Sequence, residues 1–284
     1  MTSIPVLQSI APLAATSDLW FVDIWGVVHN GVDPFASSVA ACQKFRDQGG
    51  TVLLVTNSPR PRESVGKQLD GIGIPQSAYD RIVSSGDVSR GLIEAWAGQP
   101  ILHIGPERDL PVFQGLRASP GATADDAAVA VCTGLYDDET ETPADYAGLL
   151  AKLKARDIPM ICANPDEKVE RGNRIVYCAG AVARAYEALG GKVSFAGKPF
   201  QPVYDLALEI GGQLRGGAIA KERVLAIGDG VATDIAGAAN FGIRSVFIAS
   251  GVHVTDGEAI GDAAARLFAK ATPPPIAVMN AFVW

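Results

Sequence analysis

Short apolar runs alternate along this chain with longer stretches of helical periodicity, and this alternation constrains the fold more than any other feature. The first run, residues 19–24, is apolar until Asp23, as expected of a strand buried on both faces. Comparable runs occupy residues 51–55, 82–84, 223–229 and 244–249. We therefore predict an α/β protein with a doubly wound, Rossmann-like parallel sheet.

A second series of strand-like runs begins near residue 98 and ends with a helical stretch that stops at Gly190. It contains its own strand and helix signals, enough for a small α/β domain. We predict a core domain formed by residues 1–97 and 193–284, with a smaller α/β cap domain inserted at 98–192. The tail, residues 272–284, is opened by three prolines and is expected to form a rigid arm.

Composition excludes several classes of protein. The formal net charge is −7, which is unlike the basic surface of a nucleic-acid-binding protein. No apolar run approaches the roughly 18 to 20 residues that span a bilayer. Residues 1–16 contain no Lys or Arg, so we expect no secretory signal and a cytoplasmic location. The chain also lacks the P-loop, nucleophile-elbow and zincin motifs.

Polar side chains follow the predicted core strands at the points where those strands end. In an open parallel sheet, ligands bind beyond the carboxyl ends of the strands, so these side chains are expected to share one site. They are Asp23, Thr56, Asn57, Lys198, Asp229 and Asp234. A carboxylate nucleophile, a hydroxyl and an amide for phosphoryl oxygens, a cation and a carboxylate pair for Mg²⁺ together suit aspartyl-phosphate chemistry.

The order and spacing of these motifs resemble the haloacid dehalogenase superfamily of phosphohydrolases, specifically its class IIA, with its NagD-like and pyridoxal-phosphate phosphatases. Residues 23–31 resemble the first motif of that family and 56–58 the second. Residues 197–199 resemble the third motif and 228–235 the fourth. The predicted cap lies between the second and third motifs, where class IIA proteins carry theirs.

The resemblance implies a role for each matching residue. Asp23 would attack phosphorus and form the phosphoenzyme, and Lys198 would orient Asp23 and balance charge. Thr56 would hold the transferring group. The expected phosphate- and substrate-binding residues are Asn57, Ser58, Gly26, His29, Asn164 and Asp166. The expected Mg²⁺ ligands are Asp23, the backbone carbonyl of Trp25, Asp229 and, in support, Asp234.

The chain departs from the family pattern at Trp25, two residues after the predicted nucleophile. Family members usually carry a second aspartate there, which protonates the leaving group and then activates water. Loss of general acid–base catalysis typically costs about 10²- to 10⁴-fold, so poor leaving groups should react slowly and aryl phosphates should suffer least. His29, on the same loop, is either a replacement acid–base or a residue that packs or contacts substrate.

We therefore expect a Mg²⁺-dependent phosphomonoesterase that acts on a small phosphorylated metabolite, such as a sugar phosphate, a nucleotide or an aryl phosphate. The alternative is a regulatory protein that binds Mg²⁺ and a phosphate ligand but has lost efficient hydrolysis. A third reading is hydrolysis of another bond, such as carbon–phosphorus. The resemblance further implies a mobile cap and a homodimer formed through it.

Overall fold

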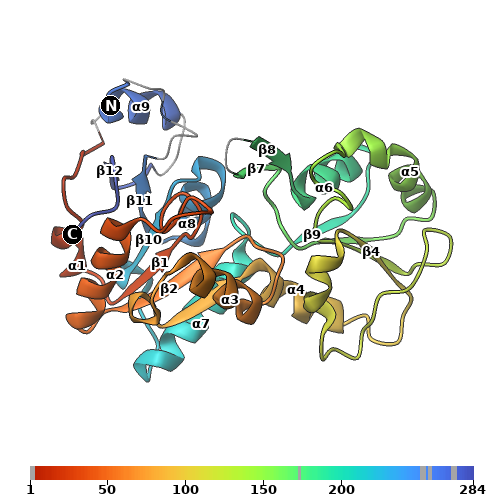
Figure 1. The fold of residues 1–284 in the computed structure, drawn as a ribbon, viewed down its shortest axis with the longest axis horizontal. Coiled ribbons are helices and arrows are strands. Elements are labelled where there is room, and N and C mark those ends of the chain that lie inside the picture. Colours follow the sequence, from red (N-terminus) through yellow and green to blue (C-terminus); the bar gives the residue numbers. More distant parts are fainter. Residues whose placement is uncertain (1–3, 172–173, 250–253, 255–257, 270–273) are drawn as a thin grey trace. The chain divides into compact units, whose positions relative to one another are not determined.

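The protein is described by a computed structural model covering residues 4–171, 174–249, 254, 258–269 and 274–284. The chain divides into two compact units, and Figure 1 traces the elements of each. The core unit comprises Met1–Thr56, Gly66–Val83 and Lys198–Trp284, and the second unit comprises Asn57–Val65 and Ser84–Gly197. Each unit contains its own parallel sheet, which confirms the predicted fold class.

The core unit is built on a six-stranded sheet of order β12-β11-β10-β1-β2-β3. Its strands are β1 (Leu19–Val22), β2 (Thr51–Thr56), β3 (Arg81–Ser84), β10 (Val224–Gly228), β11 (Arg244–Ile248) and β12 (Ala277–Met279). The pairings of β1 with β2 and β10, of β10 with β11, and of β11 with β12 are parallel. All residues of β1 are buried, because helices cover both faces of a doubly wound sheet.

Two neighbouring residues of β1 show how the helices are distributed. Successive side chains of a strand point to opposite faces, so Trp20 and Phe21 mark the two sides of the sheet. Trp20 stacks on Phe45 of α2 with ring centroids 3.8 Å apart, and Phe21 packs against Tyr204 of α7. The helices that include residues of the core unit are α1 (Ala11–Ala14), α2 (Ala36–Asp47), α3 (Arg62–Ile72), α7 (Gln201–Arg215), α8 (Ala236–Phe241) and α9 (Ile260–Leu267). Two of these helices, α2 and α7, therefore cover opposite faces of the sheet (Figure 1).

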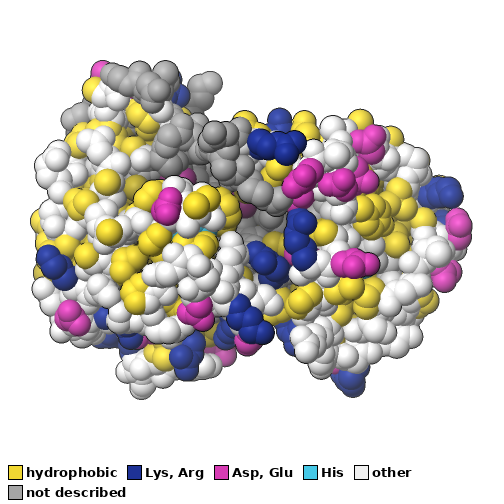
Figure 2. Space-filling model, in the orientation of Figure 1, with side chains coloured by type: hydrophobic (Ala, Val, Ile, Leu, Met, Phe, Trp, Pro, Cys, Tyr) yellow, Lys and Arg dark blue, Asp and Glu magenta, His cyan; other side chains and the backbone are white. Residues whose placement is uncertain are grey.

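The second unit is built on a four-stranded parallel sheet of order β4-β5-β6-β9. Its elements are α4 (Ser85–Glu94), β4 (Ile101–Ile104), β5 (Val129–Cys132), α5 (Ala147–Ala155), β6 (Met160–Cys162), α6 (Ala179–Ala188), β9 (Val193–Phe195) and an antiparallel hairpin of β7 (Lys168–Arg171) and β8 (Arg174–Tyr177). In the face shown in Figure 2, acidic and basic side chains of this unit are interspersed.

Short 3₁₀-helical turns and one π-helical turn are the remaining helical elements described in the two units. They are the 3₁₀ turns Gln76–Ala78, Glu107–Phe113, Pro143–Tyr146 and Lys221–Arg223, and the π-helical turn Val231–Ile235. In the described part of the chain, no helix is both long enough and apolar enough to cross a membrane.

The bounds of the second unit differ from the predicted cap bounds of 98–192. At its start, Ile93 of α4 packs in one hydrophobic cluster with Ile101 and Val129, so α4 belongs to this unit. At its end, β9 pairs with β6, with Met160 opposite Val193. The sequence pattern placed α4 and β9 in the core because local periodicity does not tell which sheet an element joins.

The end of the chain is part of the core sheet, whereas the sequence suggested a rigid arm over 272–284. Residues 272 and 273 lie outside the described residues, but β12 extends the sheet at β11, with Phe247 opposite Val278. Phe282 then packs against Trp20 with ring centroids 5.8 Å apart. A three-residue strand after a proline run carries little sequence signal, because its hydrogen-bonding partner is elsewhere in the chain.

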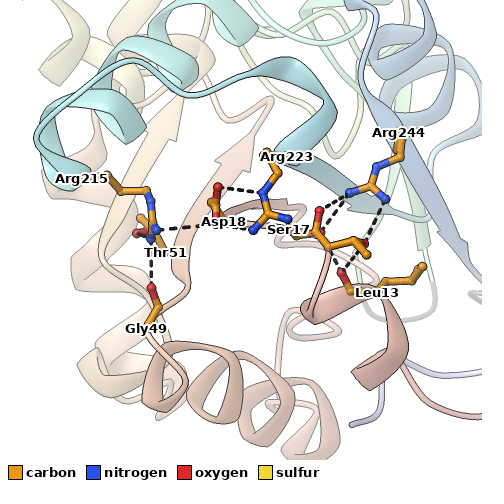
Figure 3. Close-up of polar contacts among 9 residues, drawn as sticks. Leu13, Ser17, Asp18, Gly49, Thr51, Arg215, Arg223 and Arg244 are labelled. Atoms are coloured by element: carbon orange, nitrogen blue, oxygen red, sulfur yellow. Dashed lines mark hydrogen bonds and ion pairs between the residues drawn. The ribbon is translucent and has the colours of Figure 1, made fainter.

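A polar network joins the beginnings of the core strands (Figure 3). Asp18, immediately before β1, accepts hydrogen bonds from Nε and Nη2 of Arg223 at 2.9 and 2.6 Å. Arg215 lies 3.7 Å from the same carboxylate and donates to the Gly49 carbonyl at 2.9 Å. The hydrogen bonds from Arg223, with its charge and that of Arg215, hold the pKa of Asp18 below its ordinary value.

We expect Asp18→Asn to lower the free energy of unfolding by about 1 kcal/mol at neutral pH, since it weakens a partly exposed charge-assisted pair. A carboxyl group with a lowered pKa stabilises the fold above its unfolded pKa, and this contribution is lost as the pH falls through its folded value. The difference between the two proteins should therefore vanish in acid. Urea unfolding at several pH values measures it, and Asp47→Asn, at an exposed position, is the control.

Candidate active site

The predicted site residues of the core unit lie beyond the carboxyl ends of three neighbouring strands. Asp23 follows β1, Thr56 ends β2 and Asp229 follows β10. Because β1 lies between β2 and β10 in parallel register, these three strands end at the same edge of the sheet. The Asp23 N–H donates to the Ile227 carbonyl at 2.8 Å, which ties the loop after β1 to β10.

Three carboxylates meet at this edge. One oxygen from each of Asp23, Asp229 and Asp234 lies within 4.8 Å of the others. Carboxylate oxygens are the ligands preferred by Mg²⁺, and three carboxylates in a largely buried cluster favour a divalent cation. The donor set therefore fits the Mg²⁺ predicted from the sequence.

Lys198 joins two of these carboxylates. Its Nζ donates to Asp23 Oδ1 at 2.6 Å, to Asp234 Oδ1 at 2.7 Å and to the Val55 carbonyl at 2.9 Å. The side chain is buried, with 3% of the residue exposed. Burial alone would favour the neutral amine, but the charges of Asp23 and Asp234 raise the pKa of Lys198 above its ordinary value. Lys198 is therefore a fixed positive charge beside Asp23.

The two buried carboxyl groups are harder to ionise than exposed ones. Burial raises the pKa of Asp23 to about 6, against the opposing charge of Lys198 and with a further rise from the charge of Asp229. Burial and the charge of Asp23 likewise raise the pKa of Asp234 to about 6. A bound cation would lower both values, because an adjacent positive charge favours the ionised form.

Asp234 is held by the turn that contains it. Its Oδ2 accepts a hydrogen bond from the Gly230 N–H at 3.1 Å, and the Ile235 N–H donates to the Gly230 carbonyl at 3.1 Å. The π-helical turn Val231–Ile235 thus carries Asp234 back toward the strand end it follows. Turns of this kind are frequent at functional sites.

Gly26, predicted to bind phosphate, lies directly against the side chain of Asp229, a carboxylate of the cluster. It has a φ of +76°, and a Cβ built on it would lie 2.1 Å from Asp229 Oδ2. Only glycine adopts this backbone conformation readily and also leaves that space open. The structure therefore explains Gly26 through its close approach to Asp229.

Trp25 and His29 pack against each other in the loop after β1. Their rings meet edge to face with centroids 5.0 Å apart, and the Trp25 ring occupies the space that a Cβ on Gly31 would need. His29 is 0% exposed, and its Nδ1 accepts a hydrogen bond from the Gly31 N–H at 2.8 Å. Burial lowers the pKa of His29 to about 4, so its ring is neutral near pH 7. This environment favours the packing interpretation of His29 over the acid–base one.

The remaining predicted residues belong to the second unit and build a local network there. The Asn57 side-chain amide donates to Asp166 Oδ1 at 2.9 Å, and the Asp166 N–H donates to Asn164 Oδ1 at 3.0 Å. Ser58 accepts a hydrogen bond at its backbone carbonyl from the Gly86 N–H at 3.0 Å. Asn164 and Asp166, predicted from the sequence to contact substrate, are thus engaged in ordering the segment that begins at Asn57.

Two contributors to the site had no clear signal in the sequence. One is the Val55 carbonyl, a backbone group that accepts from Lys198. The other is Tyr204, whose hydroxyl donates to the backbone carbonyls of Thr233 and Asp234, each at 3.4 Å. Tyr204 is buried beneath the turn that carries Asp234. From sequence, a tyrosine in a helix is ordinarily assigned to the hydrophobic core. Only the folded structure shows that the Tyr204 hydroxyl contacts the turn that carries Asp234.

Comparison with known proteins connects this geometry to one family. Residues 20–117 match the family described as Haloacid dehalogenase-like hydrolase, and residues 195–271 match the family described as HAD-hydrolase-like. A hydrolase of the haloacid dehalogenase-like family from Brucella suis is 45% identical, with a TM-score of 0.87, over 98% of this chain and 100% of that one. The matched segments include every carboxylate of the cluster and Lys198.

More distant structures share the fold. A possible sugar phosphatase of the HAD superfamily from Cytophaga hutchinsonii is 22% identical, with a TM-score of 0.79, over 98% of both chains. A 4-nitrophenylphosphatase from Thermotoga maritima is 22% identical, with a TM-score of 0.72, over 95% of this chain and 96% of that one. The resemblance extends through both units, so the insertion between the second and third motifs is common to these folds.

Proposed function

This chain belongs to the haloacid dehalogenase-like hydrolases, and on that basis we propose that it hydrolyses a small phosphate monoester through a phosphoryl group carried on Asp23. The observation that supports the proposal most directly is the pairing of Asp23 with Lys198 at 2.6 Å, within 4.8 Å of two further carboxylates. A buried, ionisable carboxylate held by a fixed cation is suited to nucleophilic attack on an anionic substrate.

The proposed reaction has two steps. In the first, an Asp23 oxygen bonds to phosphorus, and the bond from phosphorus to the leaving oxygen breaks with its electron pair going to that oxygen. In the second, water attacks phosphorus and gives up a proton to solvent, while the bond from phosphorus to the Asp23 oxygen breaks and its electron pair returns to the Asp23 carboxylate. Throughout, Lys198 orients Asp23 and offsets the phosphoryl charge. Thr56 and the amide of Asn57, which follows it in the chain, would hold phosphoryl oxygens.

Asp23, Asp229 and Asp234 would hold Mg²⁺, together with the backbone carbonyl of Trp25. When bound, the ion supplies charge neutralisation at the phosphoryl oxygens. The substrate class we propose is a sugar phosphate, a nucleotide or an aryl phosphate. Two structural relatives are described as a possible sugar phosphatase and a 4-nitrophenylphosphatase, which makes aryl phosphates a reasonable first probe.

Metal removal tests this proposal. Purified protein should hydrolyse p-nitrophenyl phosphate in Mg²⁺, lose at least about 10²-fold of that rate in excess EDTA, and regain it when Mg²⁺ is restored. The expected loss follows from the three carboxylates, which repel an anionic substrate when no cation lies among them. Hydrolysis that is unchanged by EDTA would contradict the metal site, and absence of turnover in Mg²⁺ would contradict the phosphatase.

The alternative is a protein that binds Mg²⁺ and a phosphate ligand without efficient turnover. It is favoured by Trp25, whose ring packs on His29 and offers no acidic group. This alternative predicts that Mg²⁺ and inorganic phosphate together raise the unfolding temperature while p-nitrophenyl phosphate stays intact. Measuring turnover and thermal stabilisation on one preparation separates the two functions.

A further inference from the structure

Tyr204 of α7 places a buried hydroxyl group beside the turn that carries Asp234. The tyrosine is 1% exposed. Its ring stacks on Phe241 of α8 with centroids 5.3 Å apart, and the ring of Phe21 in β1 packs against it with centroids 6.4 Å apart. These two aromatic contacts come from different elements of the core unit. Together they fix the ring of Tyr204, and with it the position of the hydroxyl group.

The hydroxyl group of Tyr204 is directed at the backbone of the π-helical turn Val231–Ile235. Its oxygen lies 3.4 Å from the carbonyl oxygens of both Thr233 and Asp234, so its one proton is shared between two acceptors. Burial and the charge of Asp234 raise the pKa of Tyr204 above its ordinary value, so the group keeps that proton. A donor from a separate helix therefore holds the backbone at a residue of the carboxylate cluster.

Gly237 of α8 leaves the space that this contact requires. A Cβ built on Gly237 would lie 2.3 Å from the Tyr204 hydroxyl oxygen and 2.8 Å from the ring carbon that bears it. Glycine is unfavourable within a helix relative to alanine, and its usual benefit is the close approach of another group. The glycine in α8 is therefore explained by the phenol that lies against it.

The position of the Asp234 backbone matters for the ion that the cluster would hold. Asp234 supplies one of the three carboxylate oxygens that lie within 4.8 Å of one another. Mg²⁺ requires nearly ideal octahedral geometry with short bonds, whereas the larger Ca²⁺ accepts irregular arrangements of oxygen ligands. Groups that orient metal-binding residues commonly change metal affinity by about 10-fold or more. A turn that is fixed by an outside donor therefore suits the more demanding ion.

Resting on the metal site of the proposed function, we infer that Tyr204 is a positioning residue for Mg²⁺. Its hydroxyl group fixes the turn that carries Asp234, and the fixed turn favours Mg²⁺ over Ca²⁺. Tyr204 acts through the backbone carbonyls of the turn and has no part in phosphoryl transfer itself. Loss of the hydroxyl group keeps all three carboxylates but lets the turn shift, which weakens the binding of Mg²⁺ more than that of Ca²⁺.

Tyr204→Phe tests the inference, because it removes the hydroxyl group and keeps the buried ring. The unfolding temperature of metal-free protein, followed over a range of MgCl₂ or CaCl₂ concentrations, gives both affinities without any substrate. We expect the dissociation constant for Mg²⁺ to rise about 10-fold and that for Ca²⁺ to rise less than about 3-fold. An unchanged Mg²⁺ affinity overturns the inference, and so does an equal rise for both ions.

Tyr79→Phe is the matched control. Tyr79 is also buried in the core unit, at 5% exposed, and its hydroxyl oxygen accepts a hydrogen bond from the Gln76 side-chain amide at 2.8 Å. It precedes β3, the edge strand that lies three places from β10 in the sheet. We expect Tyr79→Phe to keep both metal affinities although it too loses a buried hydrogen bond. If it weakens Mg²⁺ binding as much as Tyr204→Phe, the effect is a general loss of stability and the inference is wrong.

These outcomes remain distinct from failure of the proposed function. If the unfolding temperature of the wild-type protein does not respond to Mg²⁺, the proposed metal site fails and this inference with it. If the wild-type protein responds and Tyr204→Phe responds with the same affinity, the metal site stands and only the inference is wrong.

Discussion

Asp23→Asn is expected to lower kcat on p-nitrophenyl phosphate by at least about 10⁴-fold, because replacing a nucleophile in a cooperative site removes the whole pathway. A carboxamide oxygen carries no negative charge and forms no stable phosphoryl ester. Its amide would still lie beside Lys198, which the remaining Asp234 holds at 2.7 Å. The measurement is steady-state hydrolysis in saturating Mg²⁺, with single-turnover mixing to detect any residual burst.

The loss should occur without loss of the fold. Burial raises the pKa of Asp23 to about 6, so burying its charge is unfavourable and a neutral amide of the same shape costs little stability. We therefore expect the thermal unfolding temperature of Asp23→Asn to stay close to that of wild type. Asp33→Asn changes an exposed aspartate nearby in the chain and should retain activity. Substantial turnover by Asp23→Asn would mean that another group attacks phosphorus.

Lys198→Ala has the second-largest expected effect, a fall in kcat/KM of about 10²- to 10³-fold. This is the usual consequence of removing one preorganised positive or hydrogen-bonding group from a site where negative charge is transferred. Without the ammonium, Asp23 and Asp234 face each other unneutralised, and both become harder to ionise. The same p-nitrophenyl phosphate assay measures the loss, and Lys44→Ala, on the exposed surface of α2, is the matched control.

Chemical rescue separates a role in catalysis from a role in folding. Lys198 is 3% exposed, so its truncation leaves a cavity between Asp23 and Asp234 with room for a small cation. Methylammonium should restore part of the activity of Lys198→Ala and have no effect on wild type. If Lys198→Ala instead retains full activity, the charge-balancing role assigned to Lys198 is wrong.

Much of the core could be predicted from local patterns. The run before Asp23 is apolar throughout because both faces of β1 are covered, and that pattern can be recognised without its partners. The carboxyl ends of parallel strands share an edge, so Asp23 and Asp229 were expected together, and the structure places them within 4.8 Å of each other and of Asp234. Lys198 was recognised from its motif, although the chain returns to the core only after the whole insertion.

Other features depend on contacts between residues far apart in the chain. The local periodicity of the sequence does not predict such contacts. The hydrogen bond from Asn57 to Asp166 spans 109 positions, and the sequence predicted these two residues only as separate substrate contacts. The membership of β9 in the second sheet depends on its pairing with β6, and β12 depends on β11. The local sequence of a short strand fits either sheet about equally well. The strand with which it pairs in the folded protein therefore decides which sheet it joins.

The loop after β1 shows both sides of this division. The sequence alone shows that Trp25 carries no acidic group and that His29 follows Asp23 on the same loop. Side-chain chemistry and chain order do not depend on the folded structure. Whether His29 reaches solvent is settled by its packing under Trp25 and by the Gly31 N–H that its Nδ1 accepts. Burial is a property of all the atoms that surround a ring, and those atoms are assembled only when the chain has folded.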